Sequence, residues 1–113
     1  MRRDRRTHFR IGYPISARPR VKIGAAEYSV LEISERGLRF AESSSGEFQS
    51  DQEITGCLIF SDGESFQLRG RVVHAKTGRY VGVHLIDQIP LAKIISEQRY
   101  LISHFPRWRP NGD

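Results

Sequence analysis

The spacing of apolar residues changes once along this chain of 113 residues, and that change is the strongest limit on its fold. From about residue 11 to residue 86, apolar side chains alternate with polar ones or form short β-branched runs between turn residues, which is typical of half-buried strands. After Pro90 they recur every three or four residues, as on one face of a helix. The sequence therefore predicts a mostly β domain that ends in one helix.

Six strands are predicted before that helix. The first lies at a sheet edge, because Pro14 and Pro19 cannot donate ladder hydrogen bonds. A turn around residues 34–37 separates the second strand from the third, and residues 42–52 form a polar loop without an apolar period. The predicted strands cover about residues 11–17, 27–33, 38–40, 54–60, 66–73 and 80–86.

The last three predicted strands form a meander. Asp62-Gly63 and Thr77-Gly78 separate them, and an Asp-Gly pair can supply the positive φ angles of a type I′ hairpin turn. Residues two apart on a strand share a face, so each of these strands has one apolar face. The residues predicted to form the core of the meander are Ile54, Leu58, Phe60, Phe66, Leu68, Val72, Val81, Val83 and Leu85.

The predicted helix covers residues 90–105. Pro90 suits the first helical turn, where its missing N–H costs nothing, and Pro106 and Pro110 end the helix. Six short antiparallel strands followed by a helix indicate a small six-stranded antiparallel β-barrel whose open mouth the helix covers. An open sheet with a packed helix is the alternative. The apolar stripe of the helix consists of Leu91, Ile94, Ile95, Leu101, Ile102 and Phe105.

Positive charge is concentrated at the N-terminus. Residues 1–10 hold five arginines against one aspartate, whereas the other residues hold thirteen basic and twelve acidic side chains. A basic arm on a nearly neutral body favours a partner with phosphates, although a solvated tail is the simpler alternative. We therefore divide the chain into a flexible basic arm (1–10), one compact domain (11–106) and a short tail (107–113).

Several classes of protein are disfavoured. No apolar run is long enough for a membrane span or a signal peptide, so we expect a cytoplasmic protein without membrane insertion. Cys57 is the only cysteine and reads as a small buried residue, and the four histidines have no zinc-ligand spacing with it. No catalytic motif is present, and His74 and His84 are typical of ordinary strand histidines. We expect no enzyme activity, no metal and no cofactor.

Two segments carry the candidate binding residues. Arg5-Arg6-Thr7-His8-Phe9-Arg10 contains an Arg-x-x-x-Arg spacing with one further arginine before it. In Glu32-Ile33-Ser34-Glu35-Arg36-Gly37, Glu32 and Ser34 project from one strand face and Ile33 from the other, and Gly37 can take a positive φ in the turn. A polar strand face beside a cationic arm is typical of a ligand-binding site.

The order of these segments resembles the PilZ domain, the bacterial receptor for cyclic di-GMP. In that family, Arg-Arg-x-x-x-Arg is followed after one strand by Asp/Asn-x-Ser-x-x-Gly. Residues 68–73 and 80–85 are similar to the last strands of the family, so the resemblance covers roughly residues 5–105. It implies a six-stranded antiparallel barrel with a C-terminal helix, as the periodicity independently predicts.

The resemblance also implies a role for each candidate residue. Arg6 and Arg10 would hold guanine edges and phosphates, to which the planar fork of arginine can donate two hydrogen bonds. Arg5 would stack on a guanine, and family members with an arginine at this position tend to bind an intercalated dimer of cyclic di-GMP. Ser34 would donate a hydrogen bond to the ligand, and Gly37 would permit its close approach.

Glu32 departs from the family pattern, which has Asp or Asn at this position. The additional methylene moves the carboxylate by more than ~1 Å, enough to weaken a fixed hydrogen bond to guanine. The alternative is that Glu32 is an exposed strand residue paired with Arg36 or Arg39, which would contribute little to stability.

The resulting hypothesis is a stand-alone, non-enzymatic cyclic di-GMP receptor whose arm folds over the ligand and creates a surface for a protein partner of unknown identity. The alternative is a PilZ-like adaptor that binds a protein with weak or no nucleotide binding. Nucleic-acid binding through the arm is disfavoured, because the nearly neutral body lacks the distributed basic face that follows a phosphate backbone.

Overall fold

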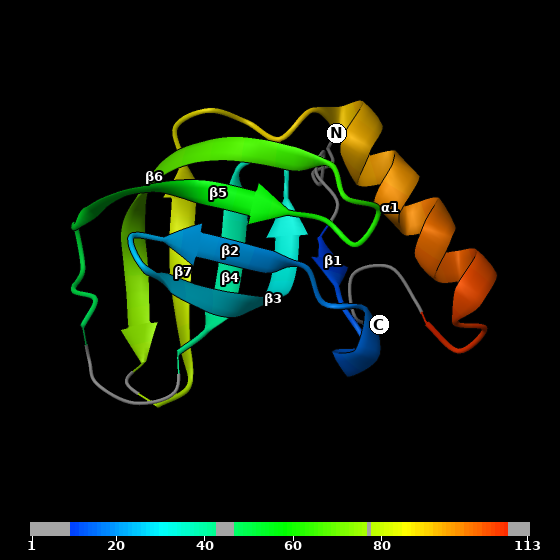
Figure 1. Cartoon of the computed structure of the whole chain (residues 1–113), viewed down its shortest axis with the longest axis horizontal. Helices are drawn as coiled ribbons and strands as arrows, with labels where there is room; N and C mark the ends of the chain where they lie inside the picture. Colours follow the sequence, from blue (N-terminus) through cyan, green and yellow to red (C-terminus); the bar gives the residue numbers. More distant parts are fainter. Residues whose placement is uncertain (1–9, 43–46, 77, 109–113) are drawn as a thin grey trace, which may run out of the picture.

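A computed structural model describes residues 10–42, 47–76 and 78–108, and Figure 1 shows strands that curve around a barrel with a helix at one end. In chain order, the elements are β1 (Ile11–Gly12), a 3-10 helix η1 (Ile15–Ala17), β2 (Arg20–Ile23), β3 (Ala26–Ser34), β4 (Gly37–Ala41), β5 (Glu53–Ile59), β6 (Ser65–Lys76), β7 (Tyr80–Leu85) and α1 (Leu91–His104).

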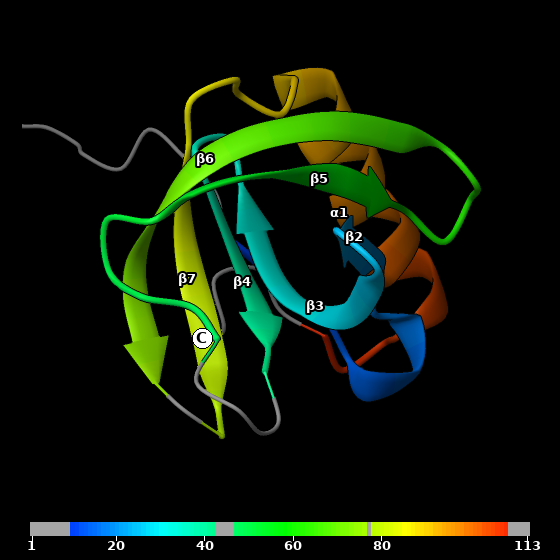
Figure 2. The ribbon, with the colours of Figure 1, turned by 60° about the vertical axis from the view of Figure 1, so that its left-hand side comes forward.

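Strands β2 to β7 close into an antiparallel barrel. Along the sheet their order is β3-β2-β5-β6-β7-β4, and β4 pairs back with β3. The nine-residue strand β3 permits this closure, because its first half pairs with β2 and its second half with β4. Figure 2 shows the strands enclosing the interior, so the predicted six-stranded barrel is confirmed over the open sheet.

The predicted first strand, 11–17, is wrong beyond Gly12. Pro14 has no N–H for a ladder, and the chain instead turns so that the Ala17 N–H donates to the Pro14 carbonyl at 2.9 Å. Ile15, which a strand over residues 11–17 would place on the same face as Ile11 and Tyr13, is 79% exposed. The short strand β1 pairs with the end of β3, where Gly12 lies opposite Glu32.

Strand β2, which was not predicted from the sequence, lies between β3 and β5 in the barrel. Its four residues run exposed, buried, exposed and half-buried, the alternation expected of a strand. Gly24, with a φ of 63°, turns the chain directly into β3. Four residues between Pro19 and a glycine are too few for a pattern-based prediction to separate them from a loop.

The β5–β6 turn at Asp62-Gly63 has a different geometry from the predicted type I′. Gly63 and Gly78 have φ angles of 90° and 78°, but Asp62 does not share the positive φ. The β5–β6 loop is closed instead by hydrogen bonds from Gly63 N to Phe60 O and from Phe60 N to Glu64 O, each 2.9 Å long. This matches a three-residue loop that ends in a left-handed glycine.

Most of the predicted meander core is buried, but Phe66 of that core and two residues outside it differ from expectation. Phe66 is only half-buried, although it packs against the core. Cys57, expected to be buried, lies on the opposite strand face from Leu58 and is half-exposed. Phe48, from the predicted polar loop, is buried with its ring 5.3 Å from that of Phe40.

Helix α1 agrees with the predicted helix, but its buried stripe is narrower than predicted. Ile94 and Leu101 are fully buried, whereas Leu91 and Ile102, which were expected to face the core, are exposed. The middle of the buried stripe is the charged residue Glu97. No helix in the described ranges has both the length and the apolar character needed to cross a membrane.

A cluster of ion pairs and one buried hydrogen bond connects α1 with the barrel. Glu97 is 4% exposed, and it accepts a 2.6 Å hydrogen bond from the Tyr13 hydroxyl. Lys93, one helical turn earlier, lies 3.7 Å from Glu97 and ion-pairs with Asp62 at 2.6 Å and Glu64 at 2.7 Å. Burial, followed by the hydrogen bond and charge of Glu97, raises the pKa of Tyr13, so the hydroxyl stays a donor. These contacts join α1 to the β5–β6 loop and to the segment after β1.

Candidate functional site

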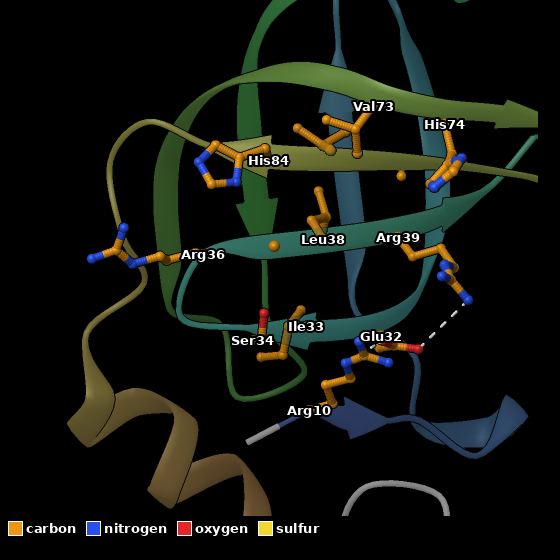
Figure 3. A pocket seen from close by; sticks show the side chains of 13 residues that line it. Arg10, Glu32, Ile33, Ser34, Arg36, Leu38, Arg39, Val73, His74 and His84 are labelled. Carbon is orange, nitrogen blue, oxygen red and sulfur yellow. Dashed lines mark ion pairs between the residues drawn. The ribbon is translucent and has the colours of Figure 1, made fainter. Parts of the chain in front are cut away.

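An open hollow of about 350 Å³ lies on the outer surface of the barrel beside Arg10. Strands β3, β4 and β7 form its floor, and the last part of β6 forms one wall (Figure 3). Four predicted site residues line it: Arg10, Glu32, Ser34 and Gly37. The other two, Arg5 and Arg6, lie outside the residues that the structure describes.

Strand alternation explains why these side chains meet. Glu32 and Ser34 face outward from β3, whereas Ile33 between them is fully buried in the core. Ser34 pairs with Gly37 across the turn to β4, so the two residues are neighbours on the outer surface.

Gly37 differs from the expectation in one respect: it has no positive φ. A β-carbon at this position would lie 3.1 Å from Ser34 Oγ, a tight contact that the serine could relieve only by moving. Glycine is therefore favoured here by space beside Ser34, rather than by the backbone angle that we had predicted.

Glu32 lies between two arginines. Its Oε2 atom is 3.9 Å from Arg10 Nε, and its Oε1 atom is 3.8 Å from Arg39 Nη1, as the dashed lines in Figure 3 indicate. The pairing with Arg39 agrees with the alternative interpretation of Glu32, whereas Arg36 turns toward Gln88. When the Gln88 amide oxygen faces Arg36, it accepts hydrogen bonds of 2.9 and 3.1 Å from that guanidinium.

Beside the core residues Ile33, Leu38 and Val83, six further lining residues were not predicted as site residues. A β-bulge between Val72 and His74 makes two consecutive residues, Val73 and His74, face the hollow, which breaks the alternation that a sequence pattern relies on. Arg39 could have been predicted from strand alternation, because it lies two residues after Gly37 on the same strand face. The six residues are Arg36, Arg39, Val73, His74, Gly82 and His84.

Gly82 lines the hollow without a side chain that would fill it. A β-carbon at this position would meet His74 Cβ at 3.6 Å and Val73 Cγ2 at 3.9 Å, which are ordinary contacts. The backbone of β7 therefore has room for a methyl group but carries none. Glycine at this position leaves the floor of the hollow without a side chain beside the half-exposed side chain of Val73.

The charges and donors of the hollow suit an anionic ligand with a planar, acceptor-rich ring. Among the described lining residues, three arginines stand against one glutamate, with His74 and His84 at the rim. Arginine forks can pair with phosphate oxygens and with guanine O6 and N7. Within the described ranges, no group of three or more His, Cys, Asp and Glu residues is placed to hold a metal ion.

Comparison with known protein families gives one match. The family model of the PilZ domain matches residues 4–103, which include both motif segments and all the strands of the barrel. A search of curated proteins finds no matching relative. Domains of this family are generally receptors for cyclic di-GMP rather than enzymes. Since the match covers most of the chain, this protein belongs to the PilZ domain family.

Proposed function

We propose that this protein is a receptor for cyclic di-GMP that binds the ligand in the hollow over β3, β4 and β7 and signals through a protein partner. The observation that carries this proposal is the meeting of Arg10 with Glu32, Ser34 and Gly37, which lie much later in the sequence, around one hollow. Family membership supports the class of ligand.

In the proposed complex, Arg10 donates to a phosphate or to a guanine edge, and the Ser34 hydroxyl donates a second hydrogen bond. Gly37 and Gly82 let the guanine approach the strands. Arg6 completes the arginine pair, and Arg5 stacks on a second, intercalated cyclic di-GMP. Because the arm precedes β1 directly, closing it over the ligand creates a new surface beside the hollow, to which the partner binds.

Calorimetric titration with cyclic di-GMP tests this function. The native protein should bind saturably with two ligands per chain, and Arg10→Ala or Arg6→Ala should abolish measurable binding with the barrel still folded. The control is Arg20→Ala, which removes one arginine from β2, where Arg20 ion-pairs with Glu27 outside the hollow. Unchanged affinity in both site variants would remove these arginines from the site.

Arg5→Ala tests the stoichiometry separately. Loss of the stacking cation should reduce the ratio toward one ligand per chain or weaken binding, because a cation–π contact contributes about 1 kcal/mol or more when desolvated. A one-to-one titration of the native protein would contradict the intercalated dimer while leaving the receptor function intact.

The second candidate function is a protein-binding adaptor with weak or no nucleotide binding, which Glu32 in place of Asp or Asn favours. Glu32→Asp separates the two. If Glu32 faces the ligand, the shorter side chain should tighten binding about fivefold, the equivalent of one recovered hydrogen bond of roughly 1 kcal/mol. The adaptor predicts no binding by either protein, and a merely exposed Glu32 predicts equal binding by both.

A further inference from the structure

Arg39 lies in the hollow but outside both motif segments. On β4, Leu38 and Phe40 are buried, so Arg39 between them projects to the outer surface and into the hollow. It lies opposite Glu32 in the β3–β4 register. The Arg39 side chain therefore lies on the same outer surface of the barrel as Ser34 and Gly37, on the strand next to that of Glu32.

The Arg39 side chain is held by an aromatic ring. Its guanidinium carbon lies 4.5 Å from the centroid of the Tyr80 ring, a cation–π contact, and Tyr80 is at the start of β7. This contact limits the rotamers of Arg39 before any ligand binds, so less side-chain entropy is lost when the guanidinium binds an anion. The side chain remains 40% exposed, which leaves donors accessible to a ligand.

Two of the three arginines of the hollow, Arg10 and Arg39, share the Glu32 carboxylate at long distances. The distances of 3.9 Å from Glu32 to Arg10 and 3.8 Å to Arg39 exceed those of charged hydrogen bonds. Half-exposed ion pairs of this length contribute little, so a ligand anion that makes shorter hydrogen bonds can replace the carboxylate.

We infer that Arg39, positioned by Tyr80, is a further phosphate-binding residue of the hollow, and that Glu32 is a built-in counter-ion that competes with the phosphodiester of the ligand for Arg10 and Arg39. This inference rests on the proposed function and extends it to two residues outside the motifs. It also gives the departure at Glu32 a role, because the longer side chain reaches both arginines.

The first test replaces the cation. Arg39→Gln should weaken binding of cyclic di-GMP by roughly tenfold, since a hydrogen bond to a charged group is lost. Arg20→Gln is the matched control: it removes the same charge from a strand arginine that also pairs with a glutamate, but outside the hollow. Equal affinities of the two variants would overturn the role of Arg39.

The second test removes the support of Arg39 and keeps its charge. Tyr80→Leu should weaken binding several-fold, and Tyr80→Phe should retain native affinity, because the ring face rather than the hydroxyl holds the guanidinium. Thermal unfolding of both variants shows whether the barrel is intact. Native affinity in a folded Tyr80→Leu protein would overturn the positioning role of Tyr80.

The third test removes the competing carboxylate. Glu32→Gln should tighten binding by a few-fold, because the phosphodiester then no longer competes with this carboxylate for Arg10 and Arg39. Glu27→Gln is the matched control, because it removes a paired carboxylate from the same strand, β3, away from the hollow. Weaker binding by Glu32→Gln, or an equal gain in Glu27→Gln, would show that Glu32 is not a competitor.

These outcomes separate the inference from the proposed function. If the folded native protein does not bind cyclic di-GMP, the proposed function fails and the roles of Arg39 and Glu32 fail with it. If the native protein binds and Arg10→Ala does not, while Arg39→Gln and Glu32→Gln both match their controls, only the roles of Arg39 and Glu32 are overturned.

Discussion

At the scale of single residues, the absence of a side chain at Gly82 matters as much to the hollow as the charges around it. Gly82 lies on β7 between Val81 and Val83, which point into the core. Its backbone angles are available to other residues, and a β-carbon would make only ordinary contacts. The fold therefore tolerates a methyl group that the ligand site would not.

Gly82→Ala should accordingly weaken binding of cyclic di-GMP at least several-fold without lowering the thermal midpoint of unfolding. Gly12→Ala is the control, because a β-carbon on β1 would meet nothing within 4 Å and Gly12 does not line the hollow. Undiminished affinity in Gly82→Ala, measured by calorimetry, would mean that the ligand does not lie over β7.

Strand alternation was sufficient to predict that Glu32 and Ser34 share an outward face, since both follow from a period of two. It was insufficient for Val73 and His74, because one extra residue at a bulge reverses the alternation and leaves no signal in the pattern. Glu97 was equally unpredictable: its burial depends on Tyr13, 84 residues away. Contacts between distant segments decide such positions.

At the scale of elements, Lys93 is the residue that ties α1 to the β5–β6 loop. Lys93→Met should lower the free energy of unfolding by about 2 kcal/mol, because Glu97 then remains buried with its negative charge uncompensated. The exposed Lys22→Met on β2 is the control and should change stability little. Equal denaturant midpoints for the two variants would contradict the proposed role of Lys93.

The same cluster gives stability a defined dependence on pH. The hydrogen bond from Lys93, followed by that from the Glu64 N–H, lowers the pKa of Asp62 below its ordinary value of 3.8. Burial opposes the charge of Lys93, but hydrogen bonds to Asp62 and Glu64 outweigh it and raise the pKa of Lys93 above 10.5. A depressed acid pKa stabilises the fold above the unfolded value, and a raised lysine pKa stabilises it below the unfolded value.

The stability difference between native protein and Lys93→Met should therefore be constant near neutral pH. It should shrink as pH falls below about 3.8, where Asp62 takes up a proton, and again as pH rises above about 10.5. Denaturant unfolding across this range measures the difference. A gap that widens in acid would show that Asp62 and Lys93 do not stabilise each other.

The regular elements were the most predictable part of the fold. The meander strands and α1 have enough residues for their periods to be clear, and their buried positions follow from those periods. The segment from Ile11 to Ile23 was not predictable in the same way, because Pro14 and Pro19 divide it into pieces of two to four residues. The barrel was predicted nonetheless, because six strands of this length favour closure.

At the scale of the whole molecule, the proposed receptor function connects the hollow with the basic N-terminal arm. Residues 1–9 lie outside the described structure, but they precede Arg10 and β1 directly, so the chain enters the fold beside the hollow. Amide hydrogen exchange over residues 1–9 should slow when cyclic di-GMP is added to the native protein and not when it is added to Arg10→Ala. Equal protection of the arm with and without ligand would contradict its closure.

The central claim is that the hollow over β3, β4 and β7 is the cyclic di-GMP site, and NMR shift mapping of the ¹⁵N-labelled protein tests it most directly. Titration with cyclic di-GMP should shift the backbone amide signals of Ser34, Gly37, Arg39, Gly82 and His84, and leave those on the exposed face of α1, such as Arg99 and Ser103, nearly unchanged. Shifts confined to α1, or no shifts at saturating ligand, would contradict the claim.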